Sequence, residues 1–594
     1  MNNLRGRRLS DNCKFVLQNV FDKDPSILVY ITLQAVFAAG LPFIQIFIPS
    51  KVLQYTTGNV AGYTMIWQVG FLSVIFALGS YTQTYLSYTI DSSLIKHRIY
   101  YMDIIMNRWM ETDLCNIESQ SGITKFLRAK NVLFNDNTGA YGMLKTSGSL
   151  LGTVISLIVY TSIIFSISPI LLLAICLPSV LHIVIINRVN RYEFEHREEI
   201  AQIDHRINYI TERIKDYRYS KDIKMYSLQD WLLSKLEYWI KDRILWTMEI
   251  AKHESWIAVI DAVLLVIRDL LAYAYIIRSI LMREIQIADF YLYFNSIMLF
   301  SAYISQFVVE IGTFRKTLYD VDDIRALLEM QDLSEGHDCI DASSPISIQL
   351  DHVSFKYPES DTYILNNVSL SIEAGENIAL VGKNGAGKTT LVKLICGLYQ
   401  PTSGSVIING NTTDKIDKKN LYQIISAVFQ DCLVLPLSVS ENVAMSKVKT
   451  VDNEKVKECL NKAGLEILTD KTEAPLTKLN SEQGIELSGG EKQKLMLARS
   501  LYKDSKLLIL DEPTAAMDPL SEKGLYLKYH EYSANKTAIF ISHRLASTKF
   551  CDRIYVLEDG RIIESGTHDE LMKMNQTYAE LYTIQSQYYQ EDKI

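Results

Sequence analysis

The sequence has few cysteines and no excess of positive charge. Its 8 cysteines are scattered over 594 residues and form no CxxC pair or metal-ligand spacing, so neither a disulfide framework nor a zinc site is expected. The formal net charge of −8 argues against a general nucleic-acid-binding protein, because such proteins need basic faces to displace counterions. We therefore expect a chain that faces a reducing compartment and has no nucleic-acid partner.

The amino-terminal segment lacks the marks of a secretory signal peptide. The stretch "MNNLRGRRLSDNCKFVLQNVF" has no apolar core and no small-residue cleavage site. Basic residues followed by an amphipathic pattern favour a helix in the membrane interface, with a disordered tail as the alternative. Residues 1–25 are predicted to form this interfacial, or elbow, helix. The stretch is too short for a peptidase domain, so leader cleavage within this chain is not expected.

Long apolar runs, by contrast, are abundant before Met330. A helix needs roughly 20 mostly apolar residues to cross a bilayer. Residues 26–330 are therefore predicted to form an α-helical transmembrane domain with six spans, followed by a linker over residues 331–344 and a soluble α/β domain over residues 345–594. The predicted spans are Ser26–Leu53, Tyr63–Thr89, Leu144–Ile167, Pro169–Ile186, Trp256–Leu281 and Ile285–Ile311.

Two long polar segments set the predicted orientation of these spans. Lys96–Lys145 and Arg188–Lys252 are rich in lysine and arginine, which the positive-inside rule assigns to the cytoplasm. Both also have helical periodicity and little glycine or proline, so they are predicted to extend the membrane helices into the cytoplasm. The result is a multi-pass membrane protein with cytoplasmic amino and carboxyl termini.

Ionisable residues lie inside two predicted spans. The fifth span contains Asp261, Arg268 and Asp269, and the sixth ends near Glu310. Such groups are costly in a bilayer unless they are paired or wetted. They are candidate linings of a membrane cavity, and a purely structural pair of Arg268 with Asp261 or Asp269 is the alternative.

A glycine-rich loop predicts a phosphate-binding site. The segment "GKNGAGKTT" follows the apolar strand Ile378–Val381 and precedes a helix, which is the context of a GxxxxGK[ST] phosphate-binding loop. Loop N–H groups and the helix N-terminus suit phosphate oxygens, Lys388 reaches the β- and γ-phosphates, and the Thr389 hydroxyl can ligate Mg²⁺. The predicted ATP contacts here are Gly382, Asn384, Gly385, Ala386, Gly387, Lys388, Thr389 and Thr390.

Two acidic residues end a second apolar strand. In "SKLLILDEPTAAMD", the run Leu507–Leu510 is followed by Asp511 and Glu512. Asp511 is a predicted Mg²⁺ ligand, and Glu512 is the predicted base that polarises the attacking water. A surface acidic pair is the ordinary alternative, and the phosphate loop in the same chain favours the catalytic pair.

The stretch "LSGGEKQKLMLARSLYKDSK" resembles the signature sequence of ATP-binding cassette (ABC) proteins, and the other motifs of that family follow in the family's order. The resemblance covers the chain from the first predicted span to the carboxyl terminus. By resemblance, the further site residues are Tyr357 (adenine stacking), Gln430 (Q-loop and Mg²⁺), Glu482 (a loop touching the membrane domain), Asp518 (D-loop) and His543 (switch histidine, catalytic with Glu512).

The resemblance also implies a dimer. Ser488, Gly489 and Gly490 open a helix whose N–H groups suit a γ-phosphate, and the family's arrangement gives them to the ATP of the opposite subunit. Closure on two ATP molecules then moves the intracellular helices and switches the side to which the cavity opens. Tyr217–Leu228 and the stretch around Glu118 resemble the second and first coupling helices. Because Glu512, His543, Ser488 and Gly490 are all present, and heterodimeric relatives usually lose one of these residues, a homodimer is favoured over pairing with a paralogous half-transporter.

Membrane domain first and cassette second resembles a half-transporter of the exporter type in a bacterial cell membrane, using ATP and Mg²⁺. The stretches "KDIKMYSL" and "VFQDCLVLPLSVSENV" are most similar to exporters of modified peptides such as lantibiotics, and lipid or drug export are alternatives. A rival of another class is an ATP-gated channel or regulatory module, which has no need of Glu512. A cytosolic ATPase with a buried helical domain conflicts with six apolar spans.

Overall fold

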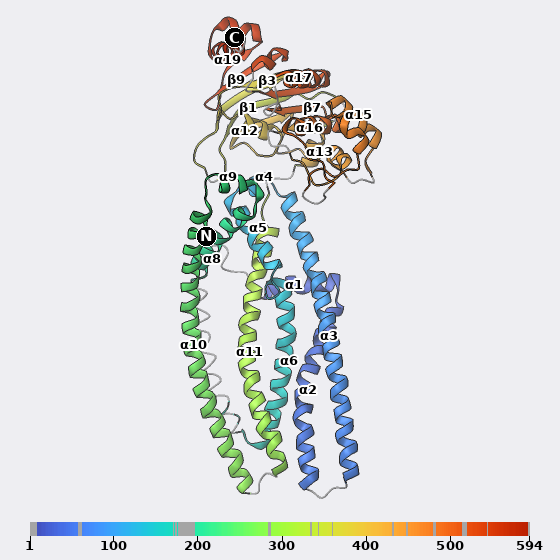
Figure 1. Ribbon diagram of the computed structural model, residues 1–594, viewed down its shortest axis with the longest axis vertical. Helices are drawn as coiled ribbons and strands as arrows, with labels where there is room; N and C mark the ends of the chain where they lie inside the picture. Colours follow the sequence, from blue (N-terminus) through green and yellow to red (C-terminus); the bar gives the residue numbers. More distant parts are fainter. Residues whose placement is uncertain are drawn as a thin grey trace. The chain divides into compact units, whose positions relative to one another are not determined.

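The computed structural model describes residues 9–57, 62–169, 172, 175, 196–282, 287–332, 336–341, 344–358, 360–429, 433–446, 450–478, 483–513, 519–542 and 545–591. The chain divides into two compact units (Figure 1). The first, called the helical unit, comprises Met1–Arg108 and Lys125–Glu329. The second, called the α/β unit, comprises Trp109–Thr124 and Met330–Ile594. A short piece of the first half of the sequence therefore belongs to the α/β unit.

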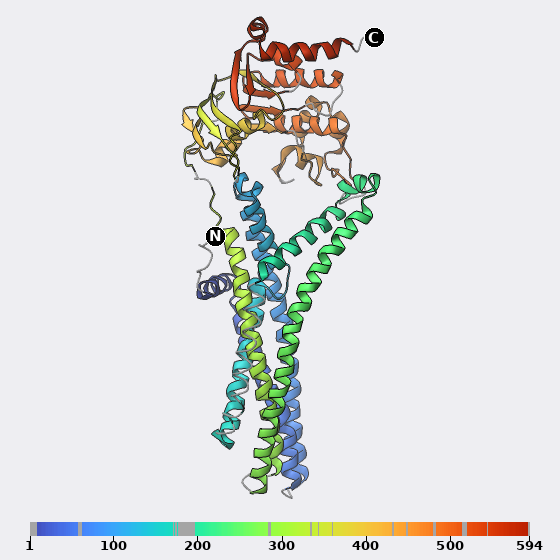
Figure 2. The ribbon, with the colours of Figure 1, turned by 90° about the vertical axis from the view of Figure 1, so that its left-hand side faces the viewer.

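In the described residues, the helical unit consists mainly of long helices. Two of its helices, α8 and α10, meet near the turn that η1 and α9 form (Figure 2), and Arg243 of α10 pairs with Asp204 of α8 at 3.0 Å. The described helices before the linker are α1 (Leu9–Lys23), α2 (Ser26–Thr57), α3 (Gly62–Glu111), α5 (Gln120–Leu133), α6 (Gly139–Ile167), α8 (Arg197–Lys215), η1 (Tyr217–Tyr219), α9 (Ser220–Met225), α10 (Gln229–Leu281) and α11 (Ile287–Leu328). The short helix α4 (Leu114–Glu118) lies between α3 and α5 in the sequence but belongs to the α/β unit.

Helix α6 is the centre of the packing in the helical unit, where it contacts both α11 and α2. Small residues permit this close approach, as in other membrane helix pairs. A Cβ added at Gly148 would lie 3.2 Å from Ile31 of α2, and one at Gly142 would lie 2.5 Å from the Asn137 backbone and 2.9 Å from Thr317 of α11. Glycine at these positions therefore lets two neighbours pack against one helix.

Apolar side chains on the outside of the helices mark the helical unit as a membrane domain. Phe71 of α3 is 66% exposed and Leu270 of α10 is 62% exposed, a pattern that suits lipid contact rather than water. Among the described residues, four helices are long and apolar enough to cross a membrane, namely α2, α3, α6 and α11. Helix α10 contains the predicted fifth span, and most of the predicted fourth span, residues 169–186, lies outside the described residues.

The α/β unit is built on two sheets. An antiparallel sheet has the order β2-β1-β4-β5, and a six-stranded sheet has the order β10-β9-β3-β8-β7-β6, in which only β9 and β10 pair antiparallel. The strands are β1 (Ile348–Phe355), β2 (Leu365–Ile372), β3 (Asn377–Val381), β4 (Ser403–Ile408), β5 (Asn411–Thr412), β6 (Ile425–Val428), β7 (Leu507–Asp511), β8 (Thr537–Ile541), β9 (Arg553–Glu558) and β10 (Arg561–Gly566).

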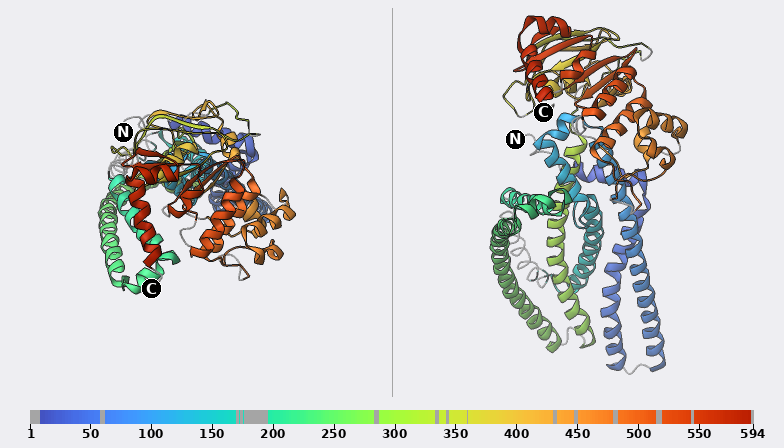
Figure 3. Two further views of the ribbon diagram at one scale, coloured as in Figure 1. Left: turned by 90° about the horizontal axis from the view of Figure 1, so that it is seen from above. Right: turned by 45° about the horizontal axis from the view of Figure 1, so that its top comes forward.

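Strands β7 and β8 are buried along their whole length, as expected for central parallel strands covered on both faces. Helices α15 and α16 lie on one side of this unit and α19 on the other (Figure 3). Its helices are α12 (Lys388–Ile395), α13 (Lys418–Ile424), α14 (Val439–Ala444), α15 (Asn453–Ala463), η3 (Glu466–Lys471), α16 (Gly489–Lys503), α17 (Pro519–Ser533), η4 (Leu545–Phe550), α18 (His568–Met574) and α19 (Thr577–Glu591).

Candidate nucleotide-binding site

The glycine-rich loop joins the buried strand β3 to helix α12, as its sequence context requires. Two of its glycines have no room for a side chain. A Cβ on Gly382 would lie 2.1 Å from the Leu557 carbonyl oxygen, and a Cβ on Gly387 would lie 2.8 Å from the Leu365 side chain. Gly387 also has φ +102°, a conformation that glycine adopts without strain. The loop therefore adopts this backbone conformation only with glycine at these positions.

Lys388, the first residue of α12, is folded into the loop and is 6% exposed. Its ammonium donates hydrogen bonds to the carbonyl oxygens of Gly382 at 2.9 Å and Lys383 at 3.0 Å. Burial lowers the pKa of Lys388, while Glu512 and Asp511 act in the opposite direction. The cation that is predicted to contact phosphate thus holds the shape of the loop from within.

Thr389 and Asp511 meet at one edge of the six-stranded sheet. The Thr389 hydroxyl donates to Asp511 Oδ2 at 2.9 Å, and Asp511 is 2% exposed at the carboxyl end of β7. The carboxyl ends of parallel strands meet at the same edge, which explains how residues from β7 and from the helix after β3 come together. A hydroxyl and a carboxylate are hard oxygen ligands of the kind that Mg²⁺ prefers.

Glu512 lies immediately after β7 and is half-buried. Its backbone has φ +50°, a left-handed conformation that costs a non-glycine residue on the order of 1 kcal/mol or more. Its N–H donates to the Ile541 carbonyl of β8 at 3.0 Å, which holds this conformation. The chain therefore turns sharply at Glu512 instead of continuing the alternation of the strand.

Tyr357 follows β1 and belongs to a group of three aromatic rings. Its ring is perpendicular to those of Phe355 (centroids 5.1 Å apart, 79°) and Tyr399 (5.4 Å, 89°). Its hydroxyl shares a hydrogen bond with that of Thr390 at 3.0 Å, which links the predicted adenine contact to the helix that begins with Lys388. A cavity of about 440 Å³ lies against Tyr357 and Tyr399.

Ser488 caps the amino terminus of α16 and is exposed. Its hydroxyl accepts from the Glu491 N–H, and the Glu491 carboxylate accepts from the Ser488 N–H at 2.8 Å and from its hydroxyl at 2.7 Å. These hydrogen bonds lower the pKa of Glu491. The sequence analysis missed this role of Glu491, although the Ser-x-x-Glu spacing of a capping box is the signal that predicts it.

Several predicted site residues lie outside the described residues: Gln430, Glu482, Asp518 and His543, together with the Asp261 side chain. Their roles stay predictions. Of the other charged residues in the predicted spans, Arg268 pairs with Asp269 at 3.0 Å. Glu310 of α11 is 8% exposed and accepts from Gln306 at 2.8 Å and from the Ser149 hydroxyl of α6. Arg268 and Glu310 are both buried.

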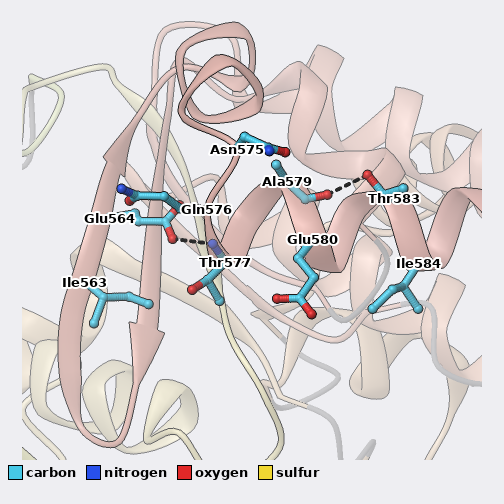
Figure 4. Close-up of a pocket in the computed structure, with 9 residues that line it drawn as sticks. All are labelled: Ile563, Glu564, Asn575, Gln576, Thr577, Ala579, Glu580, Thr583 and Ile584. Carbon is cyan, nitrogen blue, oxygen red and sulfur yellow. Dashed lines mark hydrogen bonds between the residues drawn. The ribbon is translucent and has the colours of Figure 1, made fainter.

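A second cavity, of about 740 Å³, lies elsewhere in the described part of the chain, beside β10 and α19 (Figure 4). Its buried acid is Glu564, whose carboxylate accepts from the N–H groups of Thr577 at 2.8 Å and Tyr578 at 3.3 Å. Glu564 therefore satisfies the amino terminus of α19. The cavity is open, and β10 is two strands away from β3 in the sheet, so it is not part of the phosphate site.

The geometry agrees with the comparisons to known proteins. The family model described as "ABC transporter" matches residues 365–515, a range that includes the phosphate loop, the Ser488 cap and Asp511. The nisin transport ATP-binding protein NisT of Lactococcus lactis subsp. lactis is 30% identical over 413 residues, which is 68% of this chain and 68% of that protein. The chain therefore belongs to the ABC transporter family, and it is an ATPase coupled to transport.

Two further relatives and one solved structure add to this match. The subtilin transport ATP-binding protein SpaT of Bacillus subtilis is 30% identical over 368 residues (61% of this chain, 60% of that protein). The ATP-dependent lipid A-core flippase of Escherichia coli (strain K12) is 33% identical over 255 residues (43% and 44%). A bacterial Atm1-family ABC exporter with ATP bound shares the fold, with a TM-score of 0.79 at 19% identity over 95% of this chain and 99% of that one. The chain thus has the exporter fold, which confirms the predicted fold class of a helical membrane domain followed by an α/β ATPase domain.

Proposed function

We propose that the chain is one half of a homodimeric exporter that hydrolyses ATP at two composite sites and moves a modified peptide out of a bacterial cell. It lies in the cell membrane with six spans and with both termini in the cytoplasm. The observation that supports the proposal is the group of ATPase residues that meet on one chain: Lys388 inside the phosphate loop, Thr389 bonded to Asp511, and Glu512 directly after Asp511.

The exposed cap of α16 supports a composite site. Ser488 and Gly489 are exposed to solvent, and a helix amino terminus offers N–H groups and a positive potential to an anion. In the proposed dimer, Ser488 of the partner subunit contacts the γ-phosphate that the phosphate loop of the first subunit holds. Met225 and Tyr226, in the predicted second coupling helix, are 81% and 75% exposed and supply an apolar surface for the partner's ATPase domain.

The residues present fit Mg²⁺. Thr389 and Asp511 offer a hydroxyl and a buried carboxylate 2.9 Å apart, and Gln430 completes the proposed ligands. When bound, the ion neutralises negative charge that develops on the phosphate oxygens. Among the described residues, no cluster of three or more His, Cys, Asp or Glu side chains forms a separate metal site.

In the proposed mechanism, each side chain of the site has a separate role in ATP hydrolysis. Lys388 exchanges its bonds with the carbonyls of Gly382 and Lys383 for phosphate oxygens. Glu512 accepts a proton from the attacking water, and His543 contacts the γ-phosphate beside it. Asp518 acts across the dimer. Tyr357 stacks on the π face of adenine. This contact needs no hydrogen bond to the edge of the base.

The peptide substrate is supported by two relatives whose names state nisin and subtilin transport. A lipid substrate is the second candidate, because the lipid A-core flippase matches at 33% identity. Arg268, Asp269, Glu310 and Asp261 are the candidate polar contacts in the membrane, and Asp269 already neutralises Arg268. Glu310 is therefore the better candidate for contact with a cationic cargo.

The test is transport by the purified full chain in proteoliposomes, with the Glu512→Gln chain as the blank. A lanthionine-containing peptide is expected to stimulate ATPase activity and to accumulate in the lumen of vesicles whose ATPase domains face outward. Stimulation by lipid alone would shift the substrate to the second candidate. Peptide movement that persists in the Glu512→Gln vesicles would favour an ATP-gated channel. A Glu512→Gln chain that stays monomeric in saturating ATP would contradict the homodimer and favour a paralogous partner.

A further inference from the structure

Residues 109–124, which comprise the end of α3, helix α4 and the start of α5, belong to the α/β unit and are fixed to it near their leading end. Thr112 donates to Asp332 at 2.6 Å, and the Asp113 N–H donates to the same carboxylate at 3.1 Å. Asp113 also pairs with Lys418 of α13. This anchoring leaves the carboxyl end of the short helix α4 directed at the nucleotide-binding half of the unit.

Glu118 ends α4 and contacts two residues that follow the phosphate loop. Its carboxylate accepts from Lys393 Nζ at 3.1 Å and from the Tyr399 hydroxyl. Lys393 lies in the last turn of α12, the helix that begins with Lys388, and Tyr399 follows that helix. Burial and the negative charge of Glu118 raise the pKa of Tyr399, so Tyr399 remains a hydroxyl donor at neutral pH.

Lys393 and Tyr399 both contact the ring of Tyr357. Lys393 Nζ lies 5.8 Å from the centroid of the Tyr357 ring and 5.7 Å from that of Tyr399. The two tyrosine rings are 5.4 Å apart and perpendicular. Cation–π and edge-to-face contacts have preferred geometries, so they orient a ring as well as stabilise it. Tyr357 is therefore held by a cation and a ring that are both fixed by one carboxylate.

From this geometry we infer that Glu118 is a positioning residue for adenine binding, which it supports by holding Lys393 and Tyr399 against Tyr357. The inference rests on the proposed role of Tyr357 in stacking on adenine. Glu118 lies in the loop that joins two membrane helices. A movement of that loop therefore changes the contact between Tyr357 and adenine, and with it the affinity for nucleotide. The phosphate contacts of Lys388 do not depend on it.

A loop that merely docks on the ATPase domain has a different signature from one that positions Tyr357. Loss of docking lowers stimulation by cargo and leaves the KM for ATP unchanged. Loss of positioning raises the KM for ATP and leaves kcat almost unchanged, because Tyr357 contacts the base and not the reacting phosphate. A double-mutant cycle with Tyr357 then tells whether Glu118 acts through that ring.

The experiment measures KM and kcat for ATP on the reconstituted full chain for four variants: Glu118→Gln, Tyr357→Ala, the double variant, and Glu111→Gln as a matched control. Glu111 is an exposed carboxylate in the same 109–124 segment. Glu118→Gln is expected to raise KM about fivefold with kcat within about twofold. Tyr357→Ala is expected to raise KM roughly tenfold or more, as the loss of base stacking predicts. The double variant is expected to match Tyr357→Ala within about twofold, and Glu111→Gln to match the unaltered chain.

Two further variants distinguish a loss of positioning from a loss of folding. Glu118→Asp keeps the carboxylate and is expected to restore most of the affinity, whereas Lys393→Gln removes its partner and is expected to reproduce the rise in KM. If the effects of Glu118→Gln and Tyr357→Ala multiply, or if Glu118→Gln changes only cargo stimulation, the inference is overturned. If Tyr357→Ala alone leaves KM unchanged, the adenine role itself fails and the inference falls with it, while the ATPase assignment of Lys388 and Glu512 stands.

Discussion

The capping box at Ser488 allows the stability and the catalytic role of the signature helix to be separated. Ser488→Ala removes the hydroxyl that accepts from the Glu491 N–H and donates to its carboxylate at 2.7 Å. The bond from the Ser488 N–H to Glu491 at 2.8 Å survives. Loss of a serine cap costs about 1 kcal/mol, and the exposure of this site favours the lower part of the range.

Glu491→Ala is the matched substitution, because Glu491 is the second residue of the same capping box. It leaves the Ser488 hydroxyl in place but removes the acceptor of both bonds from Ser488. The expected loss of stability is therefore similar, about 1 kcal/mol. The two variants differ in chemistry, because only Ser488 is proposed to contact the γ-phosphate. Removal of one donor to a developing charge lowers kcat about 100-fold, so that loss is expected for Ser488→Ala and not for Glu491→Ala.

The assay pairs thermal unfolding of the detergent-solubilised full chain with ATPase turnover in proteoliposomes. Both variants are expected to lower the unfolding temperature of the ATPase domain by a similar small amount. Turnover is expected to fall in Ser488→Ala and to stay within a few-fold in Glu491→Ala. Equal loss of turnover in the two variants would refute the reasoning, because the cap alone would then explain the effect of Ser488.

Three further predictions concern the same domain. Glu512→Gln is expected to reduce ATP hydrolysis at least 100-fold while ATP binding is retained, which nucleotide binding and phosphate release measured side by side will test. Gly387→Ala is expected to raise the KM for ATP and to cost on the order of 2 kcal/mol, since φ is +102° and the new Cβ would lie 2.8 Å from Leu365; an unchanged unfolding free energy would contradict this. The hydrogen bonds from Ser488 lower the pKa of Glu491 from 4.5, so its contribution is present above the unfolded pKa and is lost as pH falls through the folded pKa. Unfolding measured from about pH 6 to about pH 3 should therefore show a steeper loss in the unaltered chain than in Glu491→Gln.

The phosphate site could be predicted from the sequence because its parts are local. Strand, loop and helix follow one another between Asn377 and Ile395, so the glycine-rich pattern and its context lie in one short stretch of sequence. The steric reasons for Gly382 and Gly387 come from Leu557 and Leu365, which only the fold brings against the loop. The contact between Thr389 and Asp511 was also accessible, because parallel strands bring their carboxyl ends together. In the membrane domain, Asp261 and Asp269 were both possible partners of Arg268, and the structure gives Asp269.

The contacts of Glu118 could not be predicted in the same way. Glu118 and Lys393 are 275 positions apart, and no periodicity or turn signal links a loop between membrane helices to a helix of the ATPase domain. The resemblance to a coupling helix indicated only that this stretch touches a cassette. The pairing depends on the tertiary position of α4, which Asp332 and Lys418 fix through side-chain contacts.

The hydrogen bond between Thr389 and Asp511 has a consequence for how the site is loaded. In the resting chain a neutral hydroxyl covers a carboxylate that is 2% exposed, so the acid is not left bare in a poorly solvated place. A divalent ion that arrives alone must lose part of its own water shell and break the hydrogen bond between Thr389 and Asp511 before these two side chains can bind it. An ion that arrives on a triphosphate brings part of its coordination shell with it. The resting chain is therefore expected to ignore free magnesium and to take up the ion and the nucleotide as one ligand.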